Sequence, residues 1–176
     1  PASGASIFIV EISGAVGGPM NTDINGAEFI LDVDGDTTIT ADTDDQIDFK
    51  AGGTDRFVLS SANAKFNVGA YNAEATLTDA STISWDVSTS PVAKVTLGGN
   101  RTLGAATNAQ TGQFVSILFI QDGTGSRTIT FNAAYEHTED TAPTLTTTAS
   151  KGDLFVYRYN GSKFLEVGRN LNLTLS

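Results

Sequence analysis

Residues 113–131 read QFVSILFIQDGTGSRTITF and contain two β-rich runs around a short loop. Phe114–Ile120 is almost continuously apolar and rich in β-branched and aromatic residues, and Thr128–Phe131 alternates polar and apolar side chains. The loop Asp122–Ser126 contains two glycines, and a short Gly-containing loop between two such runs is typical of a β-hairpin. The stretch therefore predicts a hairpin whose first strand is central in a β-sheet, with both faces covered.

The rest of residues 71–176 contains shorter β-rich runs of the same kind. No segment of the chain shows apolar residues with a sustained 3.6-residue period. The dipeptide Asn160–Gly161 stands between two β-rich runs and fits a hairpin with a type I′ turn. The sequence predicts an all-β chain whose C-terminal part is a jelly-roll-like antiparallel β-sandwich. The predicted strands are 75–78, 82–87, 92–97, 114–121, 127–131, 154–159 and 163–167.

Residues 29–70 follow a different plan, a theme of about nine residues that recurs from FILDVDGD to KFNVGA. Each unit has apolar or β-branched residues at alternate positions, followed by a turn of Asp, Gly, Asn or Ser. This pattern favours a short repetitive β-shaft, built as a β-meander or as stacked rungs of a β-prism. Residues 1–28 contain a plausible strand at Ile7–Ile12 and a Gly-rich connection, which we interpret as an anchor or pairing segment.

The energetics of one such rung favour assembly of several chains. Ordering nine residues costs about 1–2 kcal/mol per residue in backbone entropy. Burial of two side chains, such as Ile47 and Phe49, returns only about 1.5–3 kcal/mol each. Since four or five rungs make a thin structure, we expect copies of the chain to cover each other's apolar faces as a homo-oligomer, most simply a trimer.

Composition and charge exclude several classes of site. The chain has 176 residues and no cysteine, so disulfides and thiolate metal sites are ruled out, and its single histidine rules out a His-rich metal site. Residues 1–70 carry eleven acidic and three basic side chains, and an acidic surface repels nucleic-acid phosphates. No apolar run approaches the ~20 residues of a membrane-spanning helix. We expect neither nucleic-acid binding nor membrane insertion.

One acidic stretch resembles the opening of a calcium-binding loop. Asp32, Asp34 and Asp36 occupy positions 1, 3 and 5 of an EF-hand loop. Position 6 should be Gly and is Thr37, and position 12 should be Glu and is Thr43, so the EF-hand interpretation fails.

Calcium binding by these turns remains the weaker of two interpretations. A second acidic turn contains Asp42 and Asp44, and a shaft could gather cations where copies of such turns meet. Solvated turn acids that prevent edge-to-edge association of strands are the favoured alternative. We therefore expect no required cofactor, with calcium as the one candidate.

Other polar and aromatic residues do not form a catalytic pattern. Trp85 alternates with Ile83 and Val87, which favours a core position over a sugar-stacking platform. His137 lies in a polar loop without a nucleophile beside it in the sequence. The acidic residues that could serve as paired carboxylates for glycoside hydrolysis show no spacing that indicates a cleft, and we expect no enzymatic activity. They are Asp79 with Asp86, and Glu136 with Glu139 and Asp140.

Three segments together resemble a C-terminal module of bacteriophage virion proteins. They are LGGNRTL at 97–103, TGQFVSILFIQDGTGSRTITF at 111–131 and KGDLFVYRYNGSKFLEVG at 151–168, and Trp85–Asp86, which precedes them, belongs to the same pattern. The preceding residues 25–61 look like the repetitive shaft segment that often stands before such modules. The resemblance implies a virion surface appendage and a tendency to trimerise, but it transfers no binding residue.

These observations lead to one functional hypothesis and two alternatives. The leading hypothesis is a non-enzymatic, trimeric appendage of tail-fibre type on the surface of a phage virion. It would bind other virion proteins and present the loops 98–109 and 133–144 to a host glycan or protein. The alternatives are a capsid decoration protein or head fibre, and a bacterial adhesin or carbohydrate-binding module.

Overall fold

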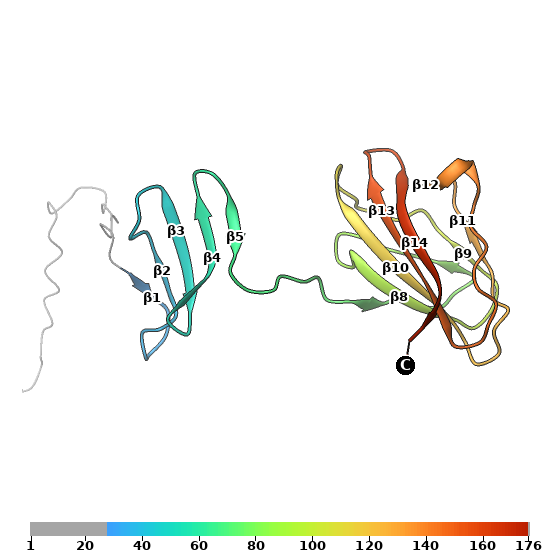
Figure 1. Cartoon of the computed structure of the whole chain (residues 1–176), viewed down its shortest axis with the longest axis horizontal. Coiled ribbons are helices and arrows are strands. Elements are labelled where there is room, and N and C mark those ends of the chain that lie inside the picture. The colour runs from blue at the N-terminus through green and yellow to red at the C-terminus, as the bar shows by residue number, and fades with distance from the viewer. Residues whose placement is uncertain (1–27, 176) are drawn as a thin grey trace, which may run out of the picture. The chain divides into compact units, whose positions relative to one another are not determined.

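The computed structural model describes residues 28–175. The chain divides into two compact units, with the boundary between Ala70 and Tyr71 (Figure 1). The strand predicted at Ile7–Ile12 lies outside the described residues. Among the described residues every regular element is a β-strand except one turn of 3₁₀ helix, η1 (Thr138–Asp140), which confirms the all-β class. None of the described residues forms a helix long and apolar enough to cross a membrane.

The N-terminal unit is a five-stranded antiparallel meander in which each strand pairs with the next along the chain. Short turns containing Asp, Gly and Ser join the strands, as the recurring sequence theme predicts. The strands are β1 (Phe29–Ile30), β2 (Thr38–Thr40), β3 (Gln46–Ala51), β4 (Thr54–Ser60) and β5 (Ala64–Phe66).

The C-terminal unit has two sheets that enclose one core. The first is six-stranded, in the order β12-β14-β13-β10-β8-β6, and the second is three-stranded, in the order β11-β9-β7. The first sheet is built from β6 (Ala75–Thr76), β8 (Val92–Leu97), β10 (Phe114–Gln121), β12 (Tyr135–Glu136), β13 (Lys151–Tyr159) and β14 (Phe164–Thr174). The second is built from β7 (Thr82–Ile83), β9 (Arg101–Leu103) and β11 (Ile129–Phe131).

Strand pairing differs from the antiparallel sandwich that the sequence predicts. β10 is central, as expected, but it pairs parallel with β8 on one side and antiparallel with β13 on the other. The three-stranded sheet is parallel throughout. Parallel neighbours need crossover connections, and from β6 to β12 the chain passes from one sheet to the other between consecutive strands.

The prediction of a hairpin over residues 113–131 is wrong, because β10 and β11 belong to different sheets and do not pair with each other. β11 leaves β10 and pairs with β9 in the other sheet. The Gln121 side chain takes the place of a hairpin partner, since its Oε1 accepts from the Arg127 N–H and its Nε2 donates to the Arg127 carbonyl, both at 2.8 Å. Gly125 has φ +75°, and a Cβ there would lie 2.5 Å from the Thr147 carbonyl oxygen, so only glycine fits this crossing.

The hairpin at Asn160–Gly161 is confirmed, but its turn type is not. β13 and β14 pair from Tyr159–Phe164 outward. Gly161 has φ +99°, whereas Asn160 keeps a negative φ and its Oδ1 accepts from the N–H groups of Ser162 and Lys163. A type I′ turn requires positive φ at both central residues, so this connection is a longer loop capped by the asparagine side chain.

The core lies between the two sheets. Phe119, Phe155 and Tyr157 come from the six-stranded sheet, and Ile83 and Leu103 from the three-stranded sheet. Each of these side chains is at most 1% exposed. The central strand β10 is fully buried on its inner face only, and its outward side chains are half-buried or exposed.

Candidate functional site

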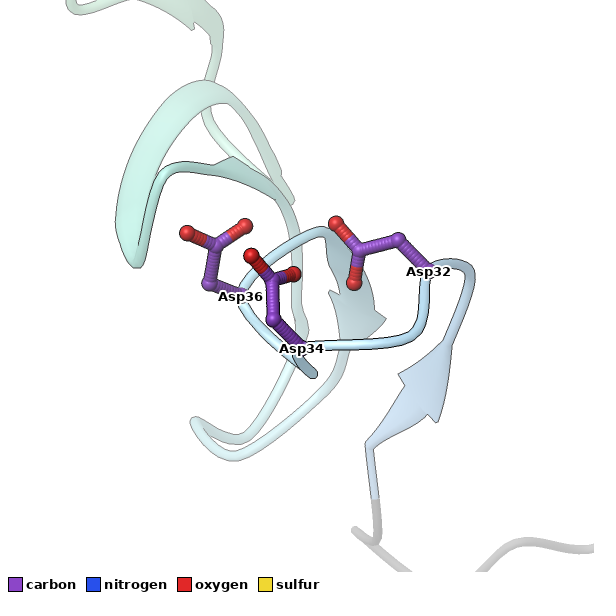
Figure 2. A group of neighbouring side chains, drawn as sticks. All are labelled: Asp32, Asp34 and Asp36. Atoms are coloured by element: carbon purple, nitrogen blue, oxygen red, sulfur yellow. The ribbon is translucent and has the colours of Figure 1, made fainter.

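The structure brings Asp32, Asp34 and Asp36 together on the loop between β1 and β2. One carboxylate oxygen from each lies within 4.8 Å of the others, and all three residues are exposed (Figure 2). Oxygen ligands of this type are those that calcium prefers. The three carboxylates singled out from the sequence thus lie close together, and calcium binding, the weaker of the two sequence interpretations, stays a prediction.

Asp42 and Asp44, the two other candidate ligands, do not join this cluster. The Asp42 carboxylate lies 3.6 Å from the Lys50 ammonium group. Asp44 is exposed and lines a hollow of its own at the turn before β3.

Asp32 also has a structural role in its loop. Its Oδ1 accepts hydrogen bonds from the N–H groups of Gly35 at 3.1 Å and Thr37 at 3.2 Å. Hydrogen bonds from Thr37 are the main reason that the pKa of Asp32 is below its usual value. The carboxylate therefore caps the backbone of the turn, as the alternative of turn acids requires.

A groove on the C-terminal unit lies where chain segments distant in sequence meet. Its volume is about 560 Å³, within the range of small-molecule sites. Hydroxyl and apolar side chains make up its lining, and the only charged side chain among its described lining residues is that of Asp86. The lining residues are Thr76, Leu77, Thr78, Ala80, Thr82, Ser84, Trp85, Asp86, Ser90, Ala105 and Thr107.

Hydrogen bonds hold the Asp86 carboxylate of this groove in place. Asp86 Oδ1 accepts from the Ser88 N–H and hydroxyl at 3.0 and 2.7 Å, and Oδ2 accepts from Asn108 Nδ2 at 2.8 Å. These bonds, those from Ser88 first, hold the pKa of Asp86 below its usual value. Trp85 is 1% exposed and donates its indole N–H to the Ser90 carbonyl at 2.7 Å, so the alternative of a sugar-stacking platform is wrong.

Sequence reasoning did not find the groove. Its hydroxyl residues are scattered over three segments and follow no spacing that a motif could describe. Of its lining, only Trp85, Asp86 and the loop 98–109, which supplies Ala105 and Thr107, are candidates from the sequence, and nothing in the sequence connects them with one another.

Three of the five carboxylates considered for glycoside hydrolysis, Asp79, Asp86 and Glu136, are engaged with neighbours. Asp79 accepts two hydrogen bonds of 2.7 Å from the Arg101 guanidinium group, and Glu136 pairs with Lys163. These partners hold the pKa values of Asp79 and Glu136 below their usual range. A glycosidase acid needs a raised pKa, so neither residue is suited to that role.

His137 lies in a packed cluster at the edge of the core. It is 8% exposed, and its Nε2 lies 3.1 Å from the Tyr157 hydroxyl. Its ring packs edge-on against Phe131 with centroids 4.6 Å apart. Burial is the main cause of a lowered His137 pKa, and it outweighs the attraction of the nearby Glu166 carboxylate.

This lowered pKa predicts a pH dependence of stability. A histidine whose pKa is lower in the folded state contributes stability above its unfolded pKa of about 6.5, and loses it as pH falls toward the folded pKa. Below about pH 6.5 we expect the free energy of unfolding to fall by up to about 1.4 kcal/mol per pH unit. Denaturation series from pH 7.5 to 5 measure this slope above the range in which most carboxylates titrate.

The variant His137→Gln is the matched control, because glutamine retains hydrogen-bonding capacity toward Tyr157 but does not titrate. Its slope between pH 6.5 and 5 should be smaller than that of the unmodified chain. Equal slopes in the two proteins would show that His137 is not the titrating group.

Comparison with known proteins places the C-terminal unit in a family. Residues 76–163 match the family model described as "Putative phage tail fibre C-terminal domain", and this match spans half of the chain. No curated protein matches the sequence. The matched residues run from β6 to the β13–β14 loop and include the whole groove, which confirms the resemblance to phage virion modules. The chain belongs to the phage tail fibre C-terminal domain family and is a phage structural protein of the tail-fibre type, a component of the virion.

Proposed function

We propose that the chain is a non-enzymatic, homotrimeric appendage on the phage surface that presents the C-terminal unit for host contact. The apolar face of the N-terminal unit is the observation that carries the proposal. It is a row of aligned side chains, one from each of the five strands. The row consists of Phe29, Ile39, Phe49, Phe57 and Phe66, which face one another in register across the sheet.

This row is largely uncovered in a single chain. Phe29 is 56% exposed, Phe49 37% and Phe66 58%, and the rings of Phe57 and Phe66 lie with centroids 4.9 Å apart. Ile47 and Leu59 face each other in a second row on the same side of the sheet. An exposed apolar face of this extent marks an interaction surface.

The opposite face cannot provide a hydrophobic core instead. Its buried residues are polar, namely Thr38, Thr40 and Asp48. The hydroxyls of Thr38 and Thr40 lack hydrogen-bond partners among the described residues. Since each ordered residue costs about 1–2 kcal/mol in backbone entropy, the sheet needs its apolar face covered to be stable. Identical chains are the partners always present in an assembly of this protein.

The variant Phe66→Ser tests the trimer. In a lone chain, substitution of this exposed residue should change the free energy of unfolding by no more than about 0.5 kcal/mol. In the proposed trimer each copy loses a buried ring, and burial of such a ring contributes about 1.5–3 kcal/mol. The concentration at which the oligomer dissociates should therefore rise at least about tenfold, as measured by analytical ultracentrifugation.

Lys65→Ser is the matched control. Lys65 is the preceding residue, also exposed, and it lies on the opposite face of the sheet beside Val58. Its substitution should leave assembly unchanged. Equal behaviour of the two variants would argue against an interface on the phenylalanine face.

For host contact we propose the groove of the C-terminal unit, which includes residues of the loop 98–109. The hydroxyl and apolar side chains that line the groove suit the hydroxyls and C–H faces of a neutral sugar. The one lining carboxylate, Asp86, disfavours acidic sugars and phosphate. No cofactor is required for such a role, and calcium remains only a candidate at Asp32, Asp34 and Asp36.

Binding of fluorescently labelled protein to host cells tests this role. Ala105→Trp should fill the groove, and we expect it to reduce cell binding at least about tenfold, a loss of about 1.4 kcal/mol. Ala73→Trp is the control, since Ala73 is also exposed and is not among the residues that line the groove. Undiminished binding of the Ala105→Trp protein would reject the groove as the contact site.

A further inference from the structure

The loop between β13 and β14 contains the pair Asn160–Gly161, and its geometry favours a reaction between these two residues. We propose that Asn160 is a site of spontaneous modification, at which the side-chain amide is converted into aspartate or isoaspartate. The reaction consumes only water and releases ammonia. The inference concerns the chemistry of this turn and is independent of the proposed trimer and of the groove.

The reaction joins the Asn160 side chain to the backbone of the next residue. The backbone N–H of Gly161 gives its proton to hydroxide, and the nitrogen forms a bond to Asn160 Cγ while Oδ1 becomes an oxyanion. When the carbonyl forms again, the Cγ–Nδ2 bond breaks, and the leaving nitrogen takes a proton from water and departs as ammonia. Water then opens the cyclic imide at either carbonyl, which leaves aspartate or isoaspartate at position 160.

Two backbone donors already surround the atom on which negative charge develops. Asn160 Oδ1 accepts hydrogen bonds from the Ser162 N–H at 2.9 Å and from the Lys163 N–H at 2.7 Å. Donors about 2.7–3.1 Å from a developing oxyanion stabilise the tetrahedral intermediates of acyl transfer. The turn that caps the hairpin therefore also polarises the carbonyl that the Gly161 nitrogen attacks.

The attacking nitrogen is accessible. Gly161 is exposed and has no side chain that could shield its own N–H. This N–H is not among the hydrogen-bond donors in the part of the chain that the structure describes. Asn160 is exposed as well, so hydroxide and water reach both residues. Of the asparagines among residues 28–175, Asn160 is the one that a glycine follows.

Asn132 provides an internal comparison within the same unit. It is also exposed, and its Oδ1 accepts from the N–H two residues further on, that of Ala134, at 2.9 Å. It differs from Asn160 in two respects. Ala133 follows it, and the Cβ of an alanine hinders the attack, and one described donor instead of two contacts its Oδ1. We therefore expect a much slower reaction at Asn132.

The two products affect the hairpin differently. Both add a negative charge to the loop. Aspartate keeps an acceptor for the two N–H groups, and these hydrogen bonds become charge-assisted. Isoaspartate lengthens the backbone by a methylene group between the Asn160 N–H, which donates to the Lys163 carbonyl at 3.0 Å, and the rest of the turn. The isoaspartate form should therefore weaken the pairing of Tyr159 with Phe164.

Peptide mapping by mass spectrometry tests the inference on the full chain, stored at neutral and at mildly alkaline pH. Mapping separates this site from the pair Asn25–Gly26, which lies outside the described residues. Asn160 should be modified at least about tenfold faster than Asn132, a difference of about 1.4 kcal/mol in activation free energy. Both products should appear, and the rate should rise with pH, because hydroxide removes the proton of the attacking nitrogen.

Two comparisons isolate the parts played by the glycine and by the turn. Ala133→Gly places a glycine after Asn132, and the rate at Asn132 should rise but stay below that at Asn160, which has the second donor. The opposite variant, Gly161→Ala, is unsuitable, because Gly161 has φ +99° and a Cβ there would lie 3.0 Å from Thr111 Oγ1. The unmodified chain unfolded in guanidinium chloride lacks both donors and should react more slowly at Asn160 than the native chain.

The outcomes are decisive for the turn. Faster modification at Asn160 than at Asn132, together with a faster reaction in the native than in the unfolded chain, supports the inference. It is overturned if Asn160 stays unmodified or reacts no faster than Asn132. It is overturned as well if unfolding leaves the rate at Asn160 unchanged or raises it, because the turn would then not promote the reaction.

Discussion

Replacement of Phe119 by alanine is expected to lower the free energy of unfolding of the C-terminal unit by about 3–5 kcal/mol. The ring is 1% exposed and lies edge-on to Phe131 and Phe155, with centroids 6.0 and 5.7 Å away. It joins the two sheets, because Phe131 belongs to the three-stranded sheet and Phe155 to the six-stranded one. The truncation therefore removes transfer free energy and leaves a cavity that rigid strands cannot fill.

Guanidinium denaturation followed by tryptophan fluorescence measures this loss. Trp85 is the only tryptophan, and it is buried in the same core, so its emission reports on this unit alone. Tyr71→Ala is the control, since Tyr71 is 88% exposed and its loss should change stability by less than about 0.5 kcal/mol. A loss below about 1 kcal/mol for Phe119→Ala would contradict the assigned core.

Asp153→Ala is expected to have the second large effect, a loss of about 3–5 kcal/mol. The residue is 1% exposed. Its Oδ2 accepts from the Thr146 N–H at 2.6 Å, and its Oδ1 accepts from the Asn172 N–H at 2.8 Å. The carboxylate thus links the loop before β13 to β14, and alanine would leave two backbone donors without an acceptor, at about 1–3 kcal/mol each.

Asp153→Asn is the matched variant for this prediction. Asparagine keeps the shape and one acceptor oxygen but replaces the other by a donor. The same fluorescence-detected denaturation should therefore place it between the unmodified chain and Asp153→Ala. Equal stability of Asp153→Ala and the unmodified chain would mean that the two N–H groups find other acceptors.

The sequence was most informative where a strand is long and apolar. The predicted bounds 92–97 and 114–121 coincide with β8 and β10, because a run of β-branched and aromatic residues indicates a strand regardless of its partners. The short strands β9 and β12 were missed. Segments such as Arg-Thr-Leu in β9 have too few residues to show a period, and long-range pairing alone defines them.

The sequence did not indicate which strands pair with one another. Asp122–Gly123 marks a turn correctly, since Asp122 Oδ1 accepts from the Thr124 and Gly125 N–H groups. The same turn chemistry serves a hairpin or a crossing between sheets. Here the Gln121 side chain bonds to the Arg127 backbone within the loop, and Gly125 packs closely against Thr147. Only the second of these contacts joins segments distant in sequence.

The candidate sites divide in the same way. Alternating aspartates at 32, 34 and 36 are visible in the sequence, and a tight turn gathers them. Asp42 and Asp44 share the spacing but follow another turn, which separates them from the cluster. The groove is formed by residues from three segments, and the alignment of the phenylalanine row depends on strand register, so neither follows from composition or local pattern.

The molar mass of the full chain in solution tests the central claim most directly. That claim is that identical chains cover the apolar face of the N-terminal unit. Light scattering coupled to size-exclusion chromatography should give the mass of three chains of 18.3 kDa, about 55 kDa. A stable, folded species of 18.3 kDa across the measured concentrations would contradict the account.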